Sequence, residues 1–281
     1  MAGEEAIVHE RLVSVTSAGA VENQIKTIQS NHSLKKAAFT LAEALITLGI
    51  IGVVAALTLP SLIQHNIEKQ RVAQLKKAYS ELSQAYNLAV EEFGAPAEWG
   101  MGGMYEEKSH YIMATNMKKF LKLSKDCVDM TQLLVEKNCG YKGAYAVSYD
   151  YNGGIRKLVI LNDGTMVAFR SYTGECNMNF GAIKNVCGEI GIDLNGTTPP
   201  NRNGQDKFDI FMTNNKLVPA GIKGGLLEFE RACNRAVDLP YPDYSKDNMY
   251  ACAAWVLYNE NMDYLHCDDL SWAGKHSCKE K

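Results

Sequence analysis

Residues 39–63 read FTLAEALITLGIIGVVAALTLPSLI, and this stretch decides the fold class of the chain. An α-helix rises about 1.5 Å per residue, so about 25 residues are enough to cross a hydrocarbon layer about 30 Å thick. Lys35 and Lys36 stand immediately before it, and positive charge of this kind stays on the cytoplasmic side. A secretory signal peptide would have a shorter apolar core, of about 7 to 15 residues. We therefore expect a transmembrane helix over residues 39–65, with the N-terminus cytoplasmic and everything after it outside.

Residues 66–94 follow directly and predict an amphipathic helix. Their apolar residues recur mostly at intervals of three and four, with charged residues between them, which is the period of a helix with one buried face. No strong helix breaker stands between Pro60 and Gly94, so the two segments predict one long helix that ends at Gly94-Ala95-Pro96. The apolar positions are Ile67, Val72, Leu75, Tyr79, Leu82, Tyr86, Ala89, Val90 and Phe93.

Residues 95–281 predict a globular head built on an antiparallel sheet. Strand patterns cover 143–150, 155–163 and 164–173, with turn signals at Asn152-Gly153-Gly154 and Asp163-Gly164. Further strands are expected near 188–194 and 206–214, and a short helix near 116–123. The predicted fold class is α+β: a long N-terminal helix, half transmembrane and half amphipathic, packed on an antiparallel β-sheet head with a disulfide-rich C-terminal region.

All eight cysteines follow the apolar segment: Cys127, Cys139, Cys176, Cys187, Cys233, Cys252, Cys267 and Cys278. Cytosolic thiols are normally kept reduced, so an even number on the outer side of a membrane predicts disulfides. Eight cysteines allow 105 connectivities, of which pairing between sequence neighbours is the simplest. A zinc site built from His266, Cys267, His276 and Cys278, with Cys252 nearby, is the alternative for the C-terminal cysteines.

Composition and motifs argue against several functional classes. Charged residues make up 22% of the 281 residues and the formal net charge is -3, which fits neither a basic nucleic-acid binder nor a disordered acidic tail. The sequence has no HExxH, P-loop, GxSxG or dinucleotide-binding pattern. We therefore expect a protein that is not an enzyme.

The first 38 residues are expected to be a leader that is removed. Residues 1–34 carry mixed charges and no apolar period, so they cannot bury enough surface to order themselves. We expect them to be cytoplasmic or not translated. A start at Leu34 would leave a short basic leader that ends Lys35-Lys36-Ala37-Ala38.

The stretch from Lys35 to Glu43, followed by an unbroken apolar helix, resembles the prepilin cleavage and methylation motif of type IV pilins and type II secretion pseudopilins. The resemblance implies a cut between Ala38 and Phe39, N-methylation of Phe39, and a role for Glu43 in guiding subunits into a filament. It also implies a helix-bending role for Pro60. The family usually has glycine where this chain has Ala38, which predicts slower cleavage.

The resemblance implies a structural subunit of a type IV pilus or a type II secretion pseudopilus. Such a subunit waits in the bacterial inner membrane, with its N-terminus cytoplasmic and its head extracytoplasmic, and then polymerises through its N-terminal helix. Its implied partners are a prepilin peptidase, other pilin or pseudopilin subunits, the inner-membrane assembly machinery and membrane lipid. The cationic amine of Phe39 could neutralise the Glu43 carboxylate of a neighbouring subunit, because a buried charge needs such a partner.

Two smaller features remain open at this stage. Gly49 and Gly52 either allow close helix packing or lower the stability of the helix locally. In the head, Asp193, Asn195 and Asp206 supply the hard oxygen ligands that calcium prefers, and the resemblance implies that a calcium site in a head loop is possible. Asn, Asp and Gly are also ordinary turn residues, and the spacing is not that of an EF-hand.

Two rival functions use the same anchor. The chain could be a membrane-tethered extracytoplasmic binding protein or adhesin, which would remain a monomer and bind a ligand through its aromatic residues. It could also be an anchored enzyme that uses an Asp, His or Cys cluster, which free thiols or perturbed carboxylates in a pocket would favour.

Overall fold

The computed structural model describes residues 40–103, 106–131, 135, 138–139, 156–196, 198–233 and 249–280. Its chain divides into two compact units between Val53 and Val54, and each is considered by itself. The expected cleavage site at Ala38 and Phe39, and the expected strand at 143–150, lie outside the described residues.

Helix α1 (Leu41–Phe93) runs without interruption through Pro60. In the N-terminal unit, its described residues from Thr40 to Val53 are exposed apart from the half-buried Ala44. The large apolar side chains remain exposed from the start of the helix to Ile63. This part of α1 is therefore long and apolar enough to cross a membrane, as the sequence predicts.

In the head, α1 buries one face. Gly94 ends the helix with a positive φ of 80°, which glycine adopts at little cost, and the 3-10 turn η1 (Pro96–Glu98) follows. The predicted amphipathic pattern and the predicted end of the helix are both confirmed. The buried residues on this face are Glu68, Val72, Leu75, Ala78, Leu82, Ala85, Tyr86 and Ala89.

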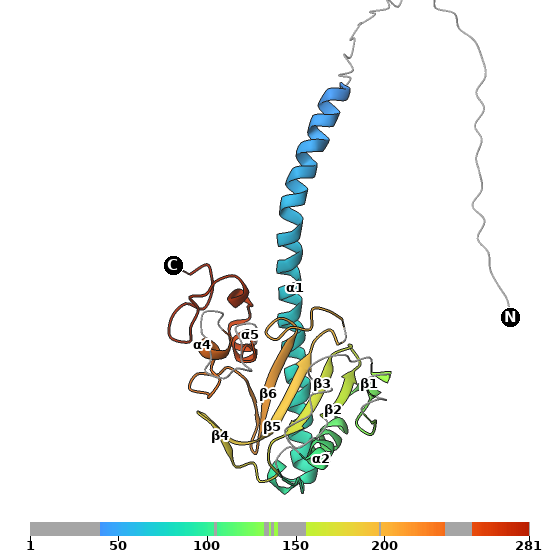
Figure 1. Ribbon diagram of the computed structural model, residues 1–281, viewed down its shortest axis with the longest axis vertical. Coiled ribbons are helices and arrows are strands. Elements are labelled where there is room, and N and C mark those ends of the chain that lie inside the picture. The colour runs from blue at the N-terminus through green and yellow to red at the C-terminus, as the bar shows by residue number, and fades with distance from the viewer. Residues whose placement is uncertain are drawn as a thin grey trace, which may run out of the picture. The chain divides into compact units, whose positions relative to one another are not determined.

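A seven-stranded antiparallel sheet forms the other layer of the head, with strand order β1-β2-β3-β5-β6-β7 and with β4 paired to β5 (Figure 1). The predicted turn at Asp163-Gly164 joins β2 to β3, and the expected antiparallel sheet is confirmed. The neighbour of β2 on its other side is β1, which the sequence did not predict. The strands are β1 (Leu123–Asp126), β2 (Lys157–Leu161), β3 (Met166–Ser171), β4 (Met178–Phe180), β5 (Ile183–Asp193), β6 (Lys207–Thr213) and β7 (Leu217–Pro219).

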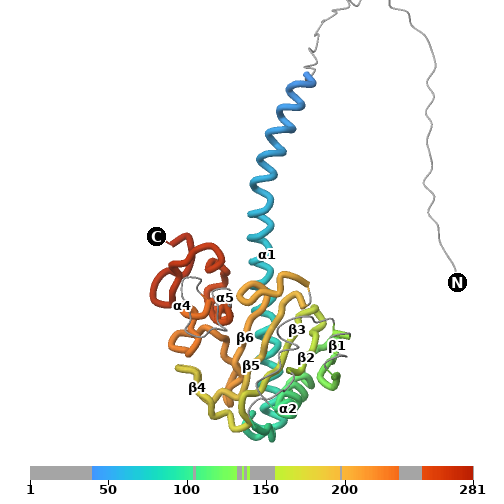
Figure 2. The backbone as a smooth tube through the Cα atoms, in the orientation of Figure 1, coloured from blue at the N-terminus to red at the C-terminus, as the bar shows by residue number. Residues whose placement is uncertain are grey.

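The head part of α1 lies against this sheet (Figure 2). Alternate residues of β3, β5 and β6, such as Phe169, Ile190 and Ile210, share one buried cluster with the inner face of the helix. Two tyrosines of α1 also donate hydrogen bonds to strand carbonyls. Tyr79 Oη lies 3.1 Å from the Leu217 oxygen, and Tyr86 Oη lies 3.0 Å from the Thr213 oxygen.

The prediction of a short helix near 116–123 is wrong in position. The structure has α2 (Glu107–Lys118), and β1 begins at Leu123. The inner face of α2 includes Ser109 and His110 beside methionine and alanine, so the helix lacks a clear apolar stripe in the sequence. His110 is buried because its Nδ1 accepts a 2.9 Å hydrogen bond from the Ser171 backbone amide of β3.

The C-terminal part of the chain packs at the β6 side of the head (Figure 1). It contains α4 (Phe229–Ala232), α5 (Ala253–Asn259) and the 3-10 turn η2 (Asp263–Leu265). The ring of Phe229 stacks on Trp255, with 3.9 Å between the centroids. Phe229, Trp255 and Tyr264 therefore fill the core of this region, whereas Tyr258 remains exposed.

Candidate functional site

The start of α1 holds Glu43 in a capping box. The Glu43 Oε2 atom accepts hydrogen bonds from the Thr40 backbone amide at 3.0 Å and from the Thr40 hydroxyl at 2.9 Å. The Glu43 backbone amide in turn donates to Thr40 Oγ1 at 3.2 Å. This reciprocal arrangement satisfies two exposed donors of the first helical turn and places a negative charge at the positive end of the helix dipole. Both side chains are exposed, so the carboxylate remains accessible to another group.

The apolar part of α1 has no packing partner among the described residues. Leu45, Ile51 and Leu57 expose 61%, 63% and 76% of their surface. A Cβ atom added at Gly49 or Gly52 would meet nothing within 4 Å in this part of the structure. The described residues therefore give no packing reason for either glycine.

All eight cysteines are paired between sequence neighbours. The disulfides are Cys127–Cys139, Cys176–Cys187, Cys233–Cys252 and Cys267–Cys278. This is the simplest of the pairings that the sequence allows.

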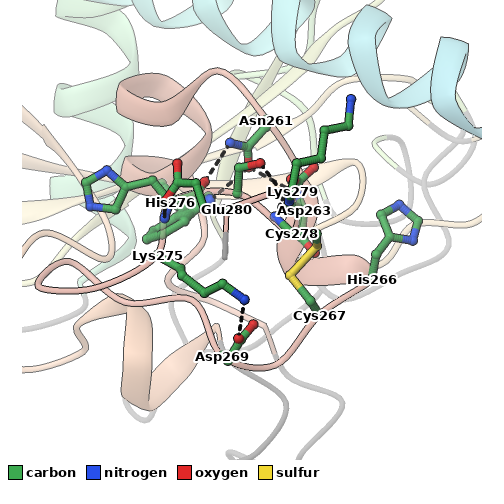
Figure 3. Close-up of a disulfide and its surroundings, with 12 residues drawn as sticks. Asn261, Asp263, His266, Cys267, Asp269, Lys275, His276, Cys278, Lys279 and Glu280 are labelled. Carbon is green, nitrogen blue, oxygen red and sulfur yellow. Dashed lines mark hydrogen bonds and ion pairs between the residues drawn. A yellow bond between two sulfur atoms is a disulfide. The ribbon is translucent and has the colours of Figure 1, made fainter.

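The zinc alternative loses its thiolates, because Cys267 and Cys278 bond to each other (Figure 3). Figure 3 shows the imidazoles of His266 and His276 pointing away from that disulfide. With every cysteine in a disulfide, the chain also offers no thiol for cysteine chemistry.

The three candidate calcium ligands do lie in one loop of the head, between β5 and β6. Asp193 is the last residue of β5, and Asp206 immediately precedes β6. Both residues are at least 99% buried. The Asp206 carboxylate accepts backbone hydrogen bonds from Asn201 at 2.9 Å and from Arg202 at 2.6 Å, so its main visible role is to hold the loop closed.

The Asn201 side chain lies where several oxygens of this loop converge. Its amide oxygen faces the Gly196 carbonyl at 2.9 Å, the Thr198 carbonyl at 3.1 Å and Asp193 Oδ2 at 3.2 Å. If the amide is turned over, its NH₂ group donates to the same three oxygens and closes the loop without an ion. If the oxygen faces inward, four oxygens meet, and either a cation or a proton on the Asp193 carboxyl is needed to offset their mutual repulsion.

Two side-chain oxygens of this loop have no hydrogen-bond donor in either orientation of the Asn201 amide. Asp193 Oδ1 and Asn195 Oδ1 are buried and have no hydrogen-bond partner among the described residues. Burial, and next the negative charge of Asp206, raise the pKa of the Asp193 carboxyl to about 7, although the nearby Lys207 opposes the shift. A desolvated carboxylate with a free lone pair beside carbonyl and amide oxygens fits the ligands that Ca²⁺ takes.

The sequence therefore identified part of this loop and missed the rest. Asp193 belongs to the oxygens that converge on Asn201, Asn195 contributes a buried amide oxygen without a hydrogen-bond partner among the described residues, and Asp206 chiefly anchors the loop backbone. The Gly196 and Thr198 carbonyls carry no signal in the sequence, because every residue has a carbonyl. Asn201 could have been noticed as the polar residue directly after Pro199-Pro200. No group of three or more His, Cys, Asp or Glu side chains converges within the described ranges.

Comparison with family models, with curated proteins and with solved structures finds no match to this chain.

Proposed function

We propose that this chain is a structural subunit of a type IV pilus or of a type II secretion pseudopilus. The observation that carries the proposal is helix α1, which is exposed and apolar up to Ile63 and then continues unbroken into the core of a disulfide-bonded head. A helix that only anchored the head would not need to be one continuous element with the core. A polymerising subunit does, because the packing of helix against helix must fix the position of every head.

Assembly begins, in this proposal, with a cut before Phe39 in the bacterial inner membrane by a prepilin peptidase. The new N-terminus carries a cationic, methylated amine beside the capping box of Thr40 and Glu43. In the apolar interior of a filament an isolated carboxylate is costly, so Glu43 selects the position in which it meets the amine of a neighbouring subunit. The head lies on the outer side of the membrane, and we propose no catalytic role for it.

A supporting observation is that Glu43 has no partner beyond its own helical turn in the described chain. A positively charged group can approach the Glu43 carboxylate without breaking its hydrogen bonds with Thr40, since both residues are exposed. Gly49 and Gly52 are a further supporting observation, because the space beside them would let a neighbouring helix approach closely.

The test is to express the full chain with a prepilin peptidase and an assembly machinery, and to compare wild type with Glu43→Gln. Intact-mass analysis should give a mature start at N-methylated Phe39 in both proteins. Filament yield should fall by at least about tenfold in Glu43→Gln, because breaking a buried ion pair costs about 3 kcal/mol or more. The matched control is Glu91→Gln, which removes an exposed carboxylate from the head part of the same helix.

An uncut N-terminus, or equal filament yields from the two variants, would contradict the proposal. An uncut but folded and anchored protein would instead favour the membrane-tethered binding protein or adhesin.

We also propose that the β5–β6 loop holds a calcium ion through Asp193, Asn195 and Asn201, together with the Gly196 and Thr198 carbonyls. The ion would supply positive charge to the buried oxygens of this loop, and the loop would then have a single closed arrangement. Ca²⁺ accepts six to eight oxygen ligands in flexible geometry, whereas Mg²⁺ demands a near-ideal octahedron and retains water. We expect the loop to prefer Ca²⁺ for this reason.

Titration calorimetry on the detergent-solubilised chain tests this site. Asp193→Asn should weaken Ca²⁺ binding by about tenfold or more, because it removes a charged ligand. Asp269→Asn, an exposed carboxylate paired only with Lys275 in the described part of the chain, should leave the affinity unchanged. Equal Ca²⁺ affinities in wild type and the two variants would place the ion elsewhere. If wild type gave no binding heat, the proposal of a calcium site would be contradicted.

A further inference from the structure

The C-terminal module, defined as residues 249–280, is held to the rest of the head by more than apolar packing. Trp255 is fully buried against Phe229, and the ring of Tyr264 meets Phe229 edge to face. The Cys233–Cys252 disulfide ties it to the head, and Glu260 forms an ion pair with Lys76 of α1. Two further polar contacts matter for the argument below: one involves the β5–β6 loop, and the other involves helix α1.

The first contact joins Tyr264 to the candidate cation loop. Its hydroxyl donates a 2.7 Å hydrogen bond to the carbonyl of Gly204, and the whole side chain is buried. Gly204 has a positive φ of 69°, and a Cβ atom there would lie 2.7 Å from Met249 Cβ and 2.8 Å from Cys252 Sγ. The loop and the C-terminal module are therefore in direct contact at Gly204, without space for either to shift alone.

The turn that carries Gly204 is tied to the oxygens of the loop. The Arg202 carbonyl accepts hydrogen bonds from three backbone amides, those of Gln205, Asp206 and Lys207. The Asp206 carboxylate binds the amides of Asn201 and Arg202, and the Asp206 carbonyl accepts from Leu194. Asn201 and the turn that presents the Gly204 carbonyl to Tyr264 are therefore joined by shared hydrogen bonds through Asp206 and Arg202.

The second contact joins the module to α1 two residues after Tyr264. His266 Nε2 lies 3.0 Å from both carboxylate oxygens of Glu68, which is buried on the inner face of the helix. Gln64, one turn earlier on α1, donates to the same carboxylate at 2.9 Å. The short segment from Tyr264 to His266 thus connects the β5–β6 loop to the part of α1 where its burial begins.

We propose that cation binding in the β5–β6 loop and docking of the C-terminal module on α1 are one coupled equilibrium, with Tyr264 as the positioning residue between them. This inference rests on the calcium site proposed above and is independent of filament assembly. An ion that fixes Asn201 and the turn at Gly204 holds the acceptor that Tyr264 needs. Through His266 it also favours the module's contact with Glu68. Since coupling is reciprocal, removing the Tyr264 hydroxyl must weaken ion binding as well.

Hydrogen exchange on the detergent-solubilised full chain tests the coupling without any mutation. Peptides covering 198–207 and 261–270 are followed in excess Ca²⁺ and in excess chelator with Mg²⁺. We expect Ca²⁺ to slow exchange in both peptides. Slower exchange in 198–207 alone would overturn the coupling and leave the calcium site intact, whereas no response in either peptide would overturn both.

Tyr264→Phe and Tyr258→Phe then form a matched pair. Both lose one hydroxyl from the C-terminal module, but Tyr258 is 64% exposed, and no hydrogen bond of its hydroxyl is recorded in the described structure. In Tyr264→Phe, Ca²⁺ should still slow exchange in 198–207 but no longer in 261–270, and its affinity should fall by about fivefold. Tyr258→Phe should match wild type. Equal Ca²⁺ responses of 261–270 in the two variants would overturn the role of Tyr264.

Discussion

Between Leu41 and Ile63, helix α1 exposes large apolar side chains all around, whereas between Glu68 and Ala89 it buries one face and leaves the other polar. Backbone hydrogen bonding is the same in both parts, since both are α-helix, so the difference lies only in what surrounds the side chains. A helix that is apolar on every side requires an apolar solvent, and one with a single apolar stripe requires a protein core. The comparison teaches that a single helix carries side chains suited to two different environments.

The same comparison separates the roles of the two parts. The head part is fixed by contacts within this chain, for example by Tyr79 and Tyr86 on strand carbonyls. The apolar part shows no such contacts in the described structure, and its large side chains are exposed. Mutations in the two parts should therefore affect different measurements.

The largest difference is expected for leucine to alanine substitutions. Leu82→Ala, at a fully buried position, should reduce the free energy of unfolding of the head by about 2 to 5 kcal/mol, because it leaves a cavity in the core. Leu57→Ala, at a position 76% exposed, should change it by less than about 0.5 kcal/mol. Urea unfolding of the solubilised chain, followed by tryptophan fluorescence, measures both. Similar losses would mean that the apolar part packs on the head.

A smaller effect is expected for Tyr86→Phe, which removes the hydrogen bond to the Thr213 carbonyl. The expected cost is about 1 kcal/mol or somewhat more, because the buried carbonyl loses its partner. Burial also raises the pKa of Tyr86 from the ordinary tyrosine value of 10.0 to about 12.

The pH dependence of Tyr86 follows from the sign of that shift. Its contribution to stability is complete below pH 10, because the unfolded tyrosine is still protonated there, and it is lost as the pH rises through about 12. The unfolding free energy of wild type should thus fall more steeply than that of Tyr86→Phe across this range. Identical slopes would show that Tyr86 is not buried in the folded head.

The smallest effect on the head is expected for Gly52→Leu, since no described atom lies within 4 Å of the added Cβ. Head unfolding should be unchanged, and the leucine should slightly strengthen an isolated helix, because glycine costs about 1 kcal/mol there. Filament yield should nevertheless fall, because a bulky residue blocks close approach of neighbouring helices. An unchanged yield would show that the glycine serves only to loosen the helix.

Elements with a strong local pattern were predictable from the sequence. The apolar segment, the stripe from Val72 to Ala89 and the β2–β3 hairpin at Asp163-Gly164 depend on residues close together in the chain. The disulfides also joined sequence neighbours, the choice that closes the shortest loops. Helix α2 was placed too late because its buried face includes Ser109 and His110, whose burial depends on contacts with other elements.

The sequence by itself determined that this chain has one segment fit for a membrane, one helical stripe fit for a core, and an even number of cysteines that all follow the apolar segment. Each follows from local composition and period, which act through solvent transfer and backbone geometry. Only the tertiary structure decided that Asn201 faces Asp193, that Tyr264 holds Gly204, and that His266 reaches Glu68 across a sequence separation of 198. Such contacts join residues whose separation along the chain carries no information about their distance in space, so they exist only once the sheet, the helix and the disulfides have fixed the backbone.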